Sequence, residues 1–331
     1  MVKLACDMMG SDLGPKELSK AVVKFVKDHE DVELTCFGKK DELAELEGLN
    51  RIKIVDCEEV VPMECGALQL MRLKKSSMVN AIKACKEKEV EGVVSAGSTG
   101  GFITGATLFL KNIENVERAA LTAPFVTAKK GKQVVILDIG ASNENSSSEL
   151  VGFAKMGSIY AREILNIKSP RVFTLCNGQE EGKGTEEIKG AYKLLKEEKS
   201  INFCGNSEAR EALDGEHDVI VTPGYPGNIF LKATEGAANL MKNLIKKSFK
   251  HSLFSKIGYL FAKNGFKEMN ETMDYRKTGG AILLGVNGVA VKGHGNSNAY
   301  AFYYAIDVAY RMVKSDIVNK VKEEFSKEYR C

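Results

Sequence analysis

The 331-residue chain is poor in the residues that build metal and redox sites. It has no tryptophan, and its four histidines, His29, His217, His251 and His294, are scattered. None of its eight cysteines forms a C-x-x-C pair. Because zinc sites need clustered histidine and cysteine ligands, the sequence predicts no metal site. The cysteines sit largely in apolar runs, and we expect reduced, mostly buried thiols of a cytosolic protein.

Signals for nucleic-acid binding, secretion and membrane spanning are also missing. The net charge of +3 and the pI near 8.3 are too mild to indicate nucleic acid as a partner. No basic segment followed by an apolar stretch and a cleavage site is seen, so we expect no signal peptide. The uncharged run Val93–Leu110 approaches the ~20 residues of a membrane span. Its glycine and hydroxyl residues instead favour a strand, a turn and a helix start.

Short apolar runs alternate with helical patterns along the chain. The strand-like runs are VKLACD, DVELTCFG, RIKIVDC, EGVVSAG, QVVILDIG, RVFTLCN, INFCGN, DVIVTPG and AILLGVNGVAV. Helical spacing of apolar residues marks residues 15–29, 149–166 and 298–314. This alternation predicts a mostly parallel sheet covered by helices on both faces. With no linker or low-complexity segment, we expect residues 1–331 to form a single α/β domain.

One region, from Ile229 to about Met269, contains no strand signal. Its apolar residues at helical spacing are Phe249, Leu253, Ile257, Leu260 and Phe261. These apolar residues are predicted to form one stripe along the helical surface. The lysines around the stripe are Lys246, Lys247, Lys250, Lys256, Lys263 and Lys267. Such a basic amphipathic pattern is too short and too charged to span a membrane. It predicts a helical pair in a subunit interface, a surface for membrane or an acidic partner, or both.

The loops after the strands are the candidate ligand sites, since open α/β sheets bind ligands beyond the carboxyl ends of their strands. The loop SAGSTGG could fold round an anion and offer it the N–H groups of the next helix, or it could simply be a tight turn. It matches neither the dinucleotide nor the Walker fingerprint. Lys183 in EEGKG could reach a phosphate or lie solvated.

Two further segments carry polar residues near predicted element ends. In HGNSNA, His294 follows a strand and precedes amides and the Ser297 hydroxyl, so it is either a structural or a functional histidine. In NIFLKATEG, Asn228 starts a helix, with Lys232 and Glu235 close behind. There is no G-x-S-x-G nucleophile elbow, and no cysteine has a histidine nearby in sequence. The loops therefore favour direct transfer on a bound anion over a covalent intermediate.

Eight motifs in order along the chain resemble one known family. They are DMMGSDLGPK, MRLKKSSM, VSAGSTG, AKMGSIYA, EEGKGTE, NFCGNSEAR, PGNIFLKATEG and DYRKTGGAILLGVNGVAVKGHGNSNA. Together they resemble the bacterial acyl-ACP:phosphate acyltransferases of phospholipid synthesis, the PlsX family. Each motif alone is weak, but their common order over nearly the whole length is a specific signal.

The resemblance implies transfer of a fatty acyl group from acyl carrier protein to inorganic phosphate. The acyl phosphate product would pass to a membrane glycerol-3-phosphate acyltransferase, for phosphatidic acid and phospholipid synthesis. It also implies a three-layer α/β/α sandwich related to phosphate acetyltransferases, with a protruding helical pair at about residues 229–270. The implied protein is a cytoplasmic homodimer that associates peripherally with the membrane and uses no cofactor or metal.

The same resemblance, combined with the loops, yields candidate site residues. The candidate catalytic residues are Lys183, Asn206, Asn228, His294 and Ser297. Of these, Lys183 is a candidate cation and the others are candidate donors to the oxyanion or thioester. The candidate substrate-binding residues are Asp12, Ser98, Thr99, Gly100, Lys232, Lys250, Lys256 and Lys263. The Ser98–Gly100 loop is assigned to phosphate, and Asp12 to orienting the site. Lys232 is a second candidate cation, and the last three lysines are assigned to carrier protein or anionic lipid.

Several loop positions depart from the family pattern. They are Ser98, Ser142, Ser146, Ser147, Cys176 and Pro223. These departures leave the fold prediction intact but keep two rivals open: a short-chain acyl-CoA phosphate acyltransferase, and a membrane scaffold that binds phosphate or acyl phosphate with little or no turnover. A dinucleotide oxidoreductase is the third and most distant alternative.

Overall fold

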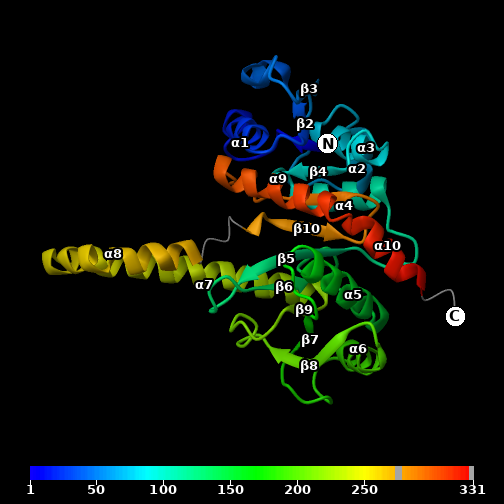
Figure 1. The fold of residues 1–331 in the computed structure, drawn as a ribbon, viewed down its shortest axis with the longest axis vertical. Helices are drawn as coiled ribbons and strands as arrows, with labels where there is room; N and C mark the ends of the chain where they lie inside the picture. The colour runs from blue at the N-terminus through cyan, green and yellow to red at the C-terminus, as the bar shows by residue number, and fades with distance from the viewer. Residues whose placement is uncertain (273–277, 328–331) are drawn as a thin grey trace.

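The chain folds around one 11-stranded β-sheet that runs through the whole molecule (Figure 1). The computed structural model describes residues 1–272 and 278–327, apart from the side chains of residues 253, 267, 268 and 270–272. The strands are β1 (Val2–Asp7), β2 (Val32–Gly38), β3 (Ile52–Asp56), β4 (Gly92–Ser95), β5 (Ala120–Val126), β6 (Gln133–Leu137), β7 (Arg171–Cys176), β8 (Asn202–Glu208), β9 (Val219–Val221), β10 (Ala281–Leu284) and β11 (Val289–Lys292). Their order across the sheet is β3-β2-β1-β4-β11-β10-β5-β6-β9-β7-β8.

The sheet consists of two parallel halves that run in opposite directions. Strands β3, β2, β1, β4 and β11 are mutually parallel, and so are β6, β9, β7 and β8. Between the halves, the pairs β11–β10, β10–β5 and β5–β6 are antiparallel. The carboxyl ends of the two halves therefore lie at opposite edges. The loops that follow the strands form two groups rather than one.

Helices cover both faces of the sheet, which confirms the predicted α/β/α sandwich. One face is covered by α1 (Pro15–Asp28), α5 (Ser147–Glu163), α6 (Glu186–Glu197), α9 (Ala299–Lys314) and α10 (Ile317–Lys327), all joined in one hydrophobic cluster. The other face carries α2 (Ala67–Arg72), α3 (Ser77–Lys86), α4 (Thr99–Leu110) and the first turns of α7 (Gly224–Lys250), over two smaller clusters. A short 3-10 helix, η1 (Lys40–Leu46), lies between β2 and β3.

Two features of the central strands differ from the sequence prediction. Strand β5 was not predicted, because Pro124 cannot donate a ladder hydrogen bond. The structure tolerates it because β10 pairs only with residues 120–122 of β5, so Pro124 faces β6 alone. The single predicted run AILLGVNGVAV is in fact the antiparallel pair β10 and β11. The chain reverses between them at Gly285, whose φ is 95°.

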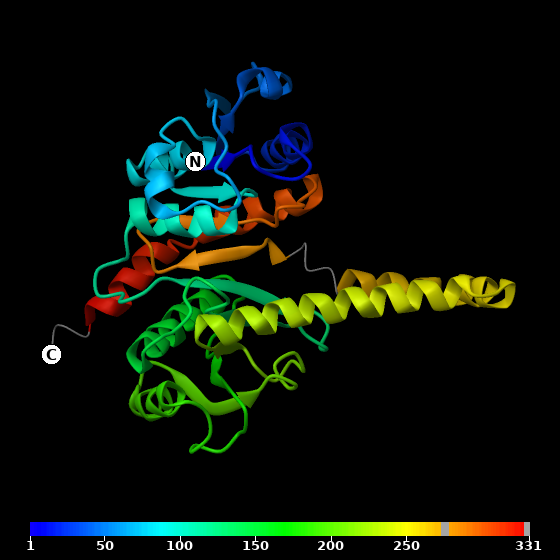
Figure 2. The same cartoon turned by 180° about the vertical axis from the view of Figure 1, so that it is seen from behind.

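The region without strand signals forms two long helices that project from the body (Figures 1 and 2). Helix α7 has 27 residues, and α8 (Leu253–Thr272) folds back beside it after a turn capped by Ser252. This turn makes the prediction of one continuous apolar stripe wrong. Phe249 faces inward, 5.4 and 4.9 Å from the ring centroids of Tyr259 and Phe266, whereas Phe261 is 89% exposed.

Parts of the predicted pattern lie outside the described residues. They are the side chains of Leu253 and Lys267 and residues 274–277 of the last motif. Within the described chain, we find no helix with the length and apolar character that crossing a membrane requires.

Candidate active site

Three strand-end loops meet at the carboxyl edge of β1, β4 and β11. The backbone N–H of Asp12 donates to the carbonyl of Gly295 at 2.9 Å. A Cβ on Gly10 would lie 3.2 Å from the Cα of Gly97, so the first two loops also touch. The structure thus brings the predicted residue Asp12 together with the loops that carry Ser98 and His294.

The amino end of α4 is open to solvent beside these loops. Thr99 and Gly100 are exposed in its first turn, and a Cβ on Gly100 would meet no atom within 4 Å. The Oγ of Ser98 caps the helix by accepting from the Gly101 N–H at 3.1 Å, and it donates to the Met63 carbonyl at 2.9 Å. The helix end can therefore attract an anion through backbone N–H groups, while the buried Ser98 hydroxyl is used within the chain.

His294 is half-buried in the loop after β11, and α7 passes close to it. Burial lowers the pKa of the His294 imidazole, and the positive charges of Lys292 and Lys232 lower it further, against the opposing effect of Glu235. The imidazole is therefore neutral at neutral pH. Lys232 and Glu235, both on α7, form an ion pair of 3.0 Å. These electrostatic effects place the predicted cation Lys232 near the predicted donor His294.

Ser297 shapes the loop that carries His294. Its hydroxyl donates to the His294 carbonyl at 2.6 Å, and its backbone N–H donates to the same oxygen at 3.0 Å. Ser297 is buried. Its role in this geometry is to hold the loop, and its predicted contact with substrate stays a prediction.

An internal carboxylate organises the loop after β6, which sequence reasoning did not assign. Asp138 Oδ1 accepts from the N–H groups of Leu121, Gly140 and Ala141 at 2.9–3.0 Å. Its Oδ2 accepts from the N–H and hydroxyl of Ser142 at 2.9 and 2.7 Å. The donors of this loop therefore point at Asp138 rather than outward. Ser142, a departure from the family pattern, is one of those donors.

The first turn of α7 packs directly on this loop and positions Asn228. A Cβ on Gly140 would lie 3.3 Å from the Cβ and Cγ of Asn228. A Cβ on Gly227 would overlap the carbonyl of Asp138, so only glycine allows the helix to come this close. Asn228 is exposed, and it stands at the edge where β6 and β9 end.

A remote side chain replaces the helix cap that Pro223 cannot provide. Pro223 occupies the N-cap position of α7 and makes no side-chain cap. The Oδ1 of buried Asn145 accepts from the N–H of Gly224 at 3.0 Å. The departure at Pro223 is thus compensated within the fold.

Lys183 lies in the loop after β7, and Asn206 lies near the end of the neighbouring strand β8, at the same sheet edge as Asn228. The Asn206 amide accepts from the Thr174 hydroxyl and donates to the Glu180 carbonyl, the latter at 2.9 Å. Asn206 is buried and holds the loop on which Lys183 is exposed. Strands β7 and β8 belong to the half of the sheet whose carboxyl ends lie at the edge opposite to the His294 loop. The predicted contact of Asn206 with substrate stays a prediction.

The three lysines predicted to meet carrier protein or lipid lie away from these loops. Lys250 ends α7, and Lys256 and Lys263 lie on α8. All three are exposed on the protruding pair. They belong to a separate surface, and their predicted partners stay a prediction.

Two buried charged residues at the strand ends escaped the sequence analysis. Asp7 ends β1 and Lys292 ends β11, and they are 1% and 4% exposed. Burial raises the pKa of Asp7 and lowers that of Lys292 to about 8, even though each charge favours the ionised form of the other. The sequence signal that could have identified them is a charged residue at the last position of an otherwise apolar strand.

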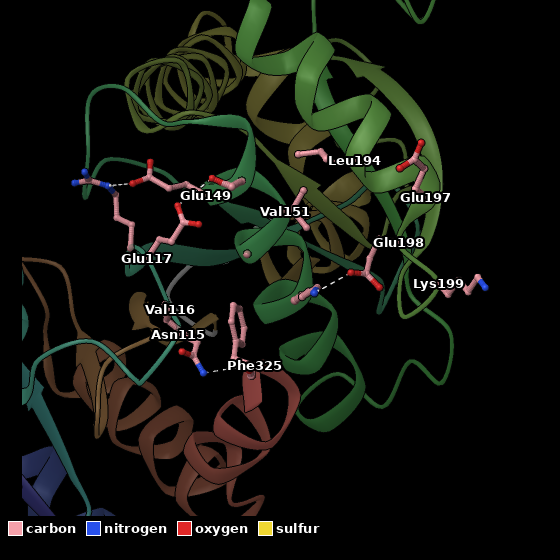
Figure 3. A pocket seen from close by; sticks show the side chains of 14 residues that line it. Asn115, Val116, Glu117, Glu149, Val151, Leu194, Glu197, Glu198, Lys199 and Phe325 are labelled. Carbon is pink, nitrogen blue, oxygen red and sulfur yellow. Dashed lines mark hydrogen bonds and ion pairs between the residues drawn. The ribbon is translucent and has the colours of Figure 1, made fainter. Parts of the chain in front are cut away.

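A cavity of about 530 Å³ lies beside α5, on the sheet face that α6 and α10 also cover (Figure 3). It is lined by residues of the 115–118 segment, α5, the end of α6 and Phe325 of α10. Four of its charged side chains pair with one another, Lys155 with Glu198 at 2.8 Å and Arg118 with Glu149 at 2.7 Å. None of the predicted site residues lines it, so we do not assign the reaction to this cavity.

Comparisons with known proteins identify the family of this chain. Residues 2–320 match the sequence model of a family described as "Fatty acid synthesis protein". The chain is 39% identical over 333 residues to a phosphate acyltransferase of Clostridium perfringens, covering 99% of this chain and 98% of the relative. This chain belongs to the phosphate acyltransferase family. A phosphate acyltransferase of Mesoplasma florum is 36% identical over 331 residues, which is 98% of this chain and 100% of the relative.

Phosphate acyltransferases are transferases, and the match to a fatty acid synthesis family places this member in lipid synthesis. A solved phosphotransacetylase from Streptococcus pyogenes shares the fold, with a TM-score of 0.61 and 15% identity over 95% of this chain and 94% of that one. This phosphate acyltransferase therefore has the predicted relation to phosphotransacetylase folds.

Proposed function

We propose that this phosphate acyltransferase transfers a fatty acyl group from acyl carrier protein to inorganic phosphate and releases acyl phosphate. The observation that carries the proposal is the meeting of an open helix end with a neutral imidazole. Thr99 and Gly100 expose the amino end of α4, and His294 stands in the loop that packs against the same sheet edge. Such a site suits an anionic nucleophile and a carbonyl that develops negative charge.

The proposed chemistry needs no covalent enzyme intermediate. A phosphate oxygen attacks the thioester carbon, and the carbonyl electron pair moves onto its oxygen. Collapse of this oxyanion breaks the carbon–sulfur bond and expels a thiolate, which takes a proton from solvent. Since the conjugate thiol has a pKa of ~8.5, the leaving group needs little acid assistance. Positioning and oxyanion stabilisation are the main tasks of the protein.

The described geometry supports a division of roles. The N–H groups of Thr99 and Gly100 receive phosphate, and Lys232 supplies positive charge near His294. The neutral His294 donates an N–H to the oxyanion. Asn228, fixed against Gly140, lies one turn before Lys232 on α7 and is the second donor to the oxyanion. The exposed Lys183 is a further cation at the same edge as Asn228.

The protruding pair supports a role at the membrane. Phe254, Leu260 and Phe261 are 87%, 68% and 89% exposed, and the exposed lysines 250, 256 and 263 lie near them in sequence. Exposed apolar side chains with neighbouring cations fit an anionic lipid surface. The exposed Leu240, Met241 and Leu244 on α7 offer a face for a second subunit. We infer a cytoplasmic homodimer, peripherally bound, that delivers acyl phosphate to a membrane glycerol-3-phosphate acyltransferase.

The deciding experiment measures acyl phosphate formation by the purified protein from long-chain acyl carrier protein and inorganic phosphate. Free carrier thiol and hydroxylamine-trapped product are followed together, with a short acyl-CoA in a parallel arm. We expect phosphate-dependent release of both products from the long-chain carrier. His294→Ala and Lys183→Ala should lower the rate. Lys193→Ala, which removes an exposed lysine from α6, should leave it unchanged.

Other outcomes would favour the rivals. Turnover only with the short acyl-CoA would identify a short-chain phosphate acyltransferase. Liposome binding without any product from a correctly loaded carrier would indicate a scaffold that binds phosphate or acyl phosphate without turnover. In that case the departures at Ser98, Ser142 and Cys176 would be disabling.

A further inference from the structure

Asp7, Ser95 and Lys292 lie side by side at the ends of three neighbouring strands. Asp7 of β1 is the register partner of Ser95 of β4, and Ser95 is the register partner of Lys292 of β11. Register partners on parallel strands point their side chains to the same face of the sheet. All three residues are buried, and all three immediately precede candidate-site loops.

The Asp7 carboxylate ties two of those loops to the sheet. It accepts from the hydroxyls of Ser77 and Ser95, both at 2.6 Å, and from the Met9 N–H at 3.2 Å. The Ser95 hydroxyl in turn accepts from the N–H of Gly97 at 3.1 Å. One buried carboxylate thus fixes the loop that leads to Asp12 and the loop that leads to the amino end of α4.

Lys292 makes the corresponding attachment for the third loop. Its ammonium group donates to the carbonyl of Gly293, the residue before His294. Its charge is attracted by Asp7 and by Asp12. The N–H of Gly293 donates to the Ser95 carbonyl at 2.9 Å, so the start of this loop is held from both sides. The side chain is too deeply buried to touch a substrate in the open part of the site.

We propose that Lys292 is a positioning residue of this phosphate acyltransferase. Through Gly293 and the charge of Asp7, its ammonium group holds the His294 loop against the loops of Asp12 and Thr99. Removing the charge leaves Asp7 without its buried counter-charge and frees the Gly293 carbonyl. His294 then loses its fixed place relative to the amino end of α4.

The groups that act on Lys292 come from several elements. Asp7 of β1 and Asp12 of the next loop favour its charged form. His294, on its own loop, feels the Lys292 charge and also those of Lys232 and Glu235 on α7. The ammonium form, present below a pKa of about 8, is the form that holds the loop.

The test compares Lys292→Met and Lys292→Arg with Lys155→Met. Lys155 is an equally buried lysine on the opposite face, paired with Glu198, and serves as the matched control for the loss of a buried charge. We expect Lys292→Met to lower kcat/KM by roughly 10- to 100-fold, the range that a misplaced reacting group produces. The wild type should lose kcat/KM as pH rises through about 8. In Lys292→Met, kcat/KM should not fall as pH rises through this range. In Lys292→Arg, part of the rate should return, and the fall in kcat/KM should shift to higher pH.

A second measurement does not depend on turnover. Hydrogen exchange should become faster at the protected amides of Gly293, Ser297 and Asp12 in Lys292→Met but not in Lys155→Met. The measurement of kcat/KM rests on the proposed reaction, whereas the measurement of hydrogen exchange does not. If wild type forms no acyl phosphate, the proposed function fails and hydrogen exchange alone decides the role of Lys292. Unchanged exchange at these amides, or the same fall in kcat/KM with rising pH in Lys292→Met as in wild type, would overturn the proposal.

Discussion

Asn228 rests on the backbone of Gly140, with its Cβ and Cγ 3.3 Å from the position that a Cβ of residue 140 would occupy. Gly140 has a φ of 128°, in a region that side chains rarely adopt. The contact joins the first turn of α7 to the loop held by Asp138. The place of Asn228 in the site therefore depends on the missing side chain at residue 140.

Gly140→Ala should reduce both stability and activity. The strained φ costs of order 1–3 kcal/mol of unfolding free energy, and the new methyl group displaces Asn228. Urea unfolding and kcat measure the two effects separately. Gly131→Ala is the control, because Gly131 has a φ of 76° but nothing within 4 Å of its Cβ position. That variant should lose stability and keep its kcat; an equal loss of kcat in both would contradict the role of the contact.

Ser98→Ala should weaken the amino end of α4. Loss of an N-cap costs about 1 kcal/mol of unfolding free energy, whereas Ser98→Asn keeps a good cap and should cost little. Because α4 carries the proposed phosphate site, Ser98→Ala should also raise the KM for phosphate. Ser146→Ala removes the cap of α5 instead and should change stability alone. An unchanged KM for phosphate in Ser98→Ala would show that the helix cap does not contribute to phosphate binding.

The pH dependence of stability should reveal the buried Lys292. Its folded pKa of about 8 lies below the ordinary value of 10.5, so between these values the unfolded chain binds more protons. The contribution of Lys292 to the free energy of unfolding therefore rises with pH between these two pKa values, by about 3 kcal/mol in total. The burial penalty is fully present below pH 8. The stability of wild type relative to Lys292→Met should increase from pH 8 to pH 10, measured by urea unfolding; a constant difference would contradict the lowered pKa.

The His294 imidazole should respond in opposite directions to two changes on α7. Lys232→Gln removes a positive charge and leaves Glu235 without its partner, so the pKa of His294 should rise. Glu235→Gln removes the negative charge, and the pKa should fall further below 6.5. NMR titration of the imidazole protons measures both. Shifts in the same direction would show that α7 does not act on His294 by charge.

Phe254→Ser and Phe261→Ser should weaken binding to anionic vesicles. Burying one phenylalanine is worth ~1.5–3 kcal/mol, so each change should lower vesicle affinity by roughly 10-fold or more. Because both rings are exposed, unfolding free energy should change by less than about 0.5 kcal/mol. Leu68→Ser is the control, since Leu68 is 77% exposed on the body of the molecule. An equal loss of vesicle affinity in all three variants would show that the protruding pair is not the membrane-binding surface.

The sequence was sufficient for much of the fold because local periodicity determines elements such as α1 and α9. It was not sufficient for β5, because whether Pro124 is tolerated depends on how far β10 extends beside it. It could not reveal the opposite direction of the two sheet halves, since an apolar run reads the same in either direction. This is why loops that look alike in sequence divide between two edges.

The candidate site was partly predictable for the same reason. Asp12 and His294 follow strands that the sequence marks clearly, and the structure places both at the expected strand ends. Helix α7, however, begins at Gly224, four residues before the predicted start at Asn228. The partnership of Asp7 with Lys292 depends on register between strands nearly the whole chain apart. Likewise, the Asp138 loop needs Leu121 of the unpredicted strand β5 as one of its donors.

The position of β11 between β4 and β10 sets the order in which the molecule can be completed during synthesis. Strand β4 ends at Ser95, but its neighbour toward the centre of the sheet, β11, is not made until residues 289–292. At ~5–20 residues per second, the nascent N-terminal half waits roughly 10–40 s with that strand edge open. An open edge invites pairing with other chains, so the newborn protein needs protection during this interval. The loop with His294 arrives last, and no ribosome-bound fragment that ends before it can form the complete site.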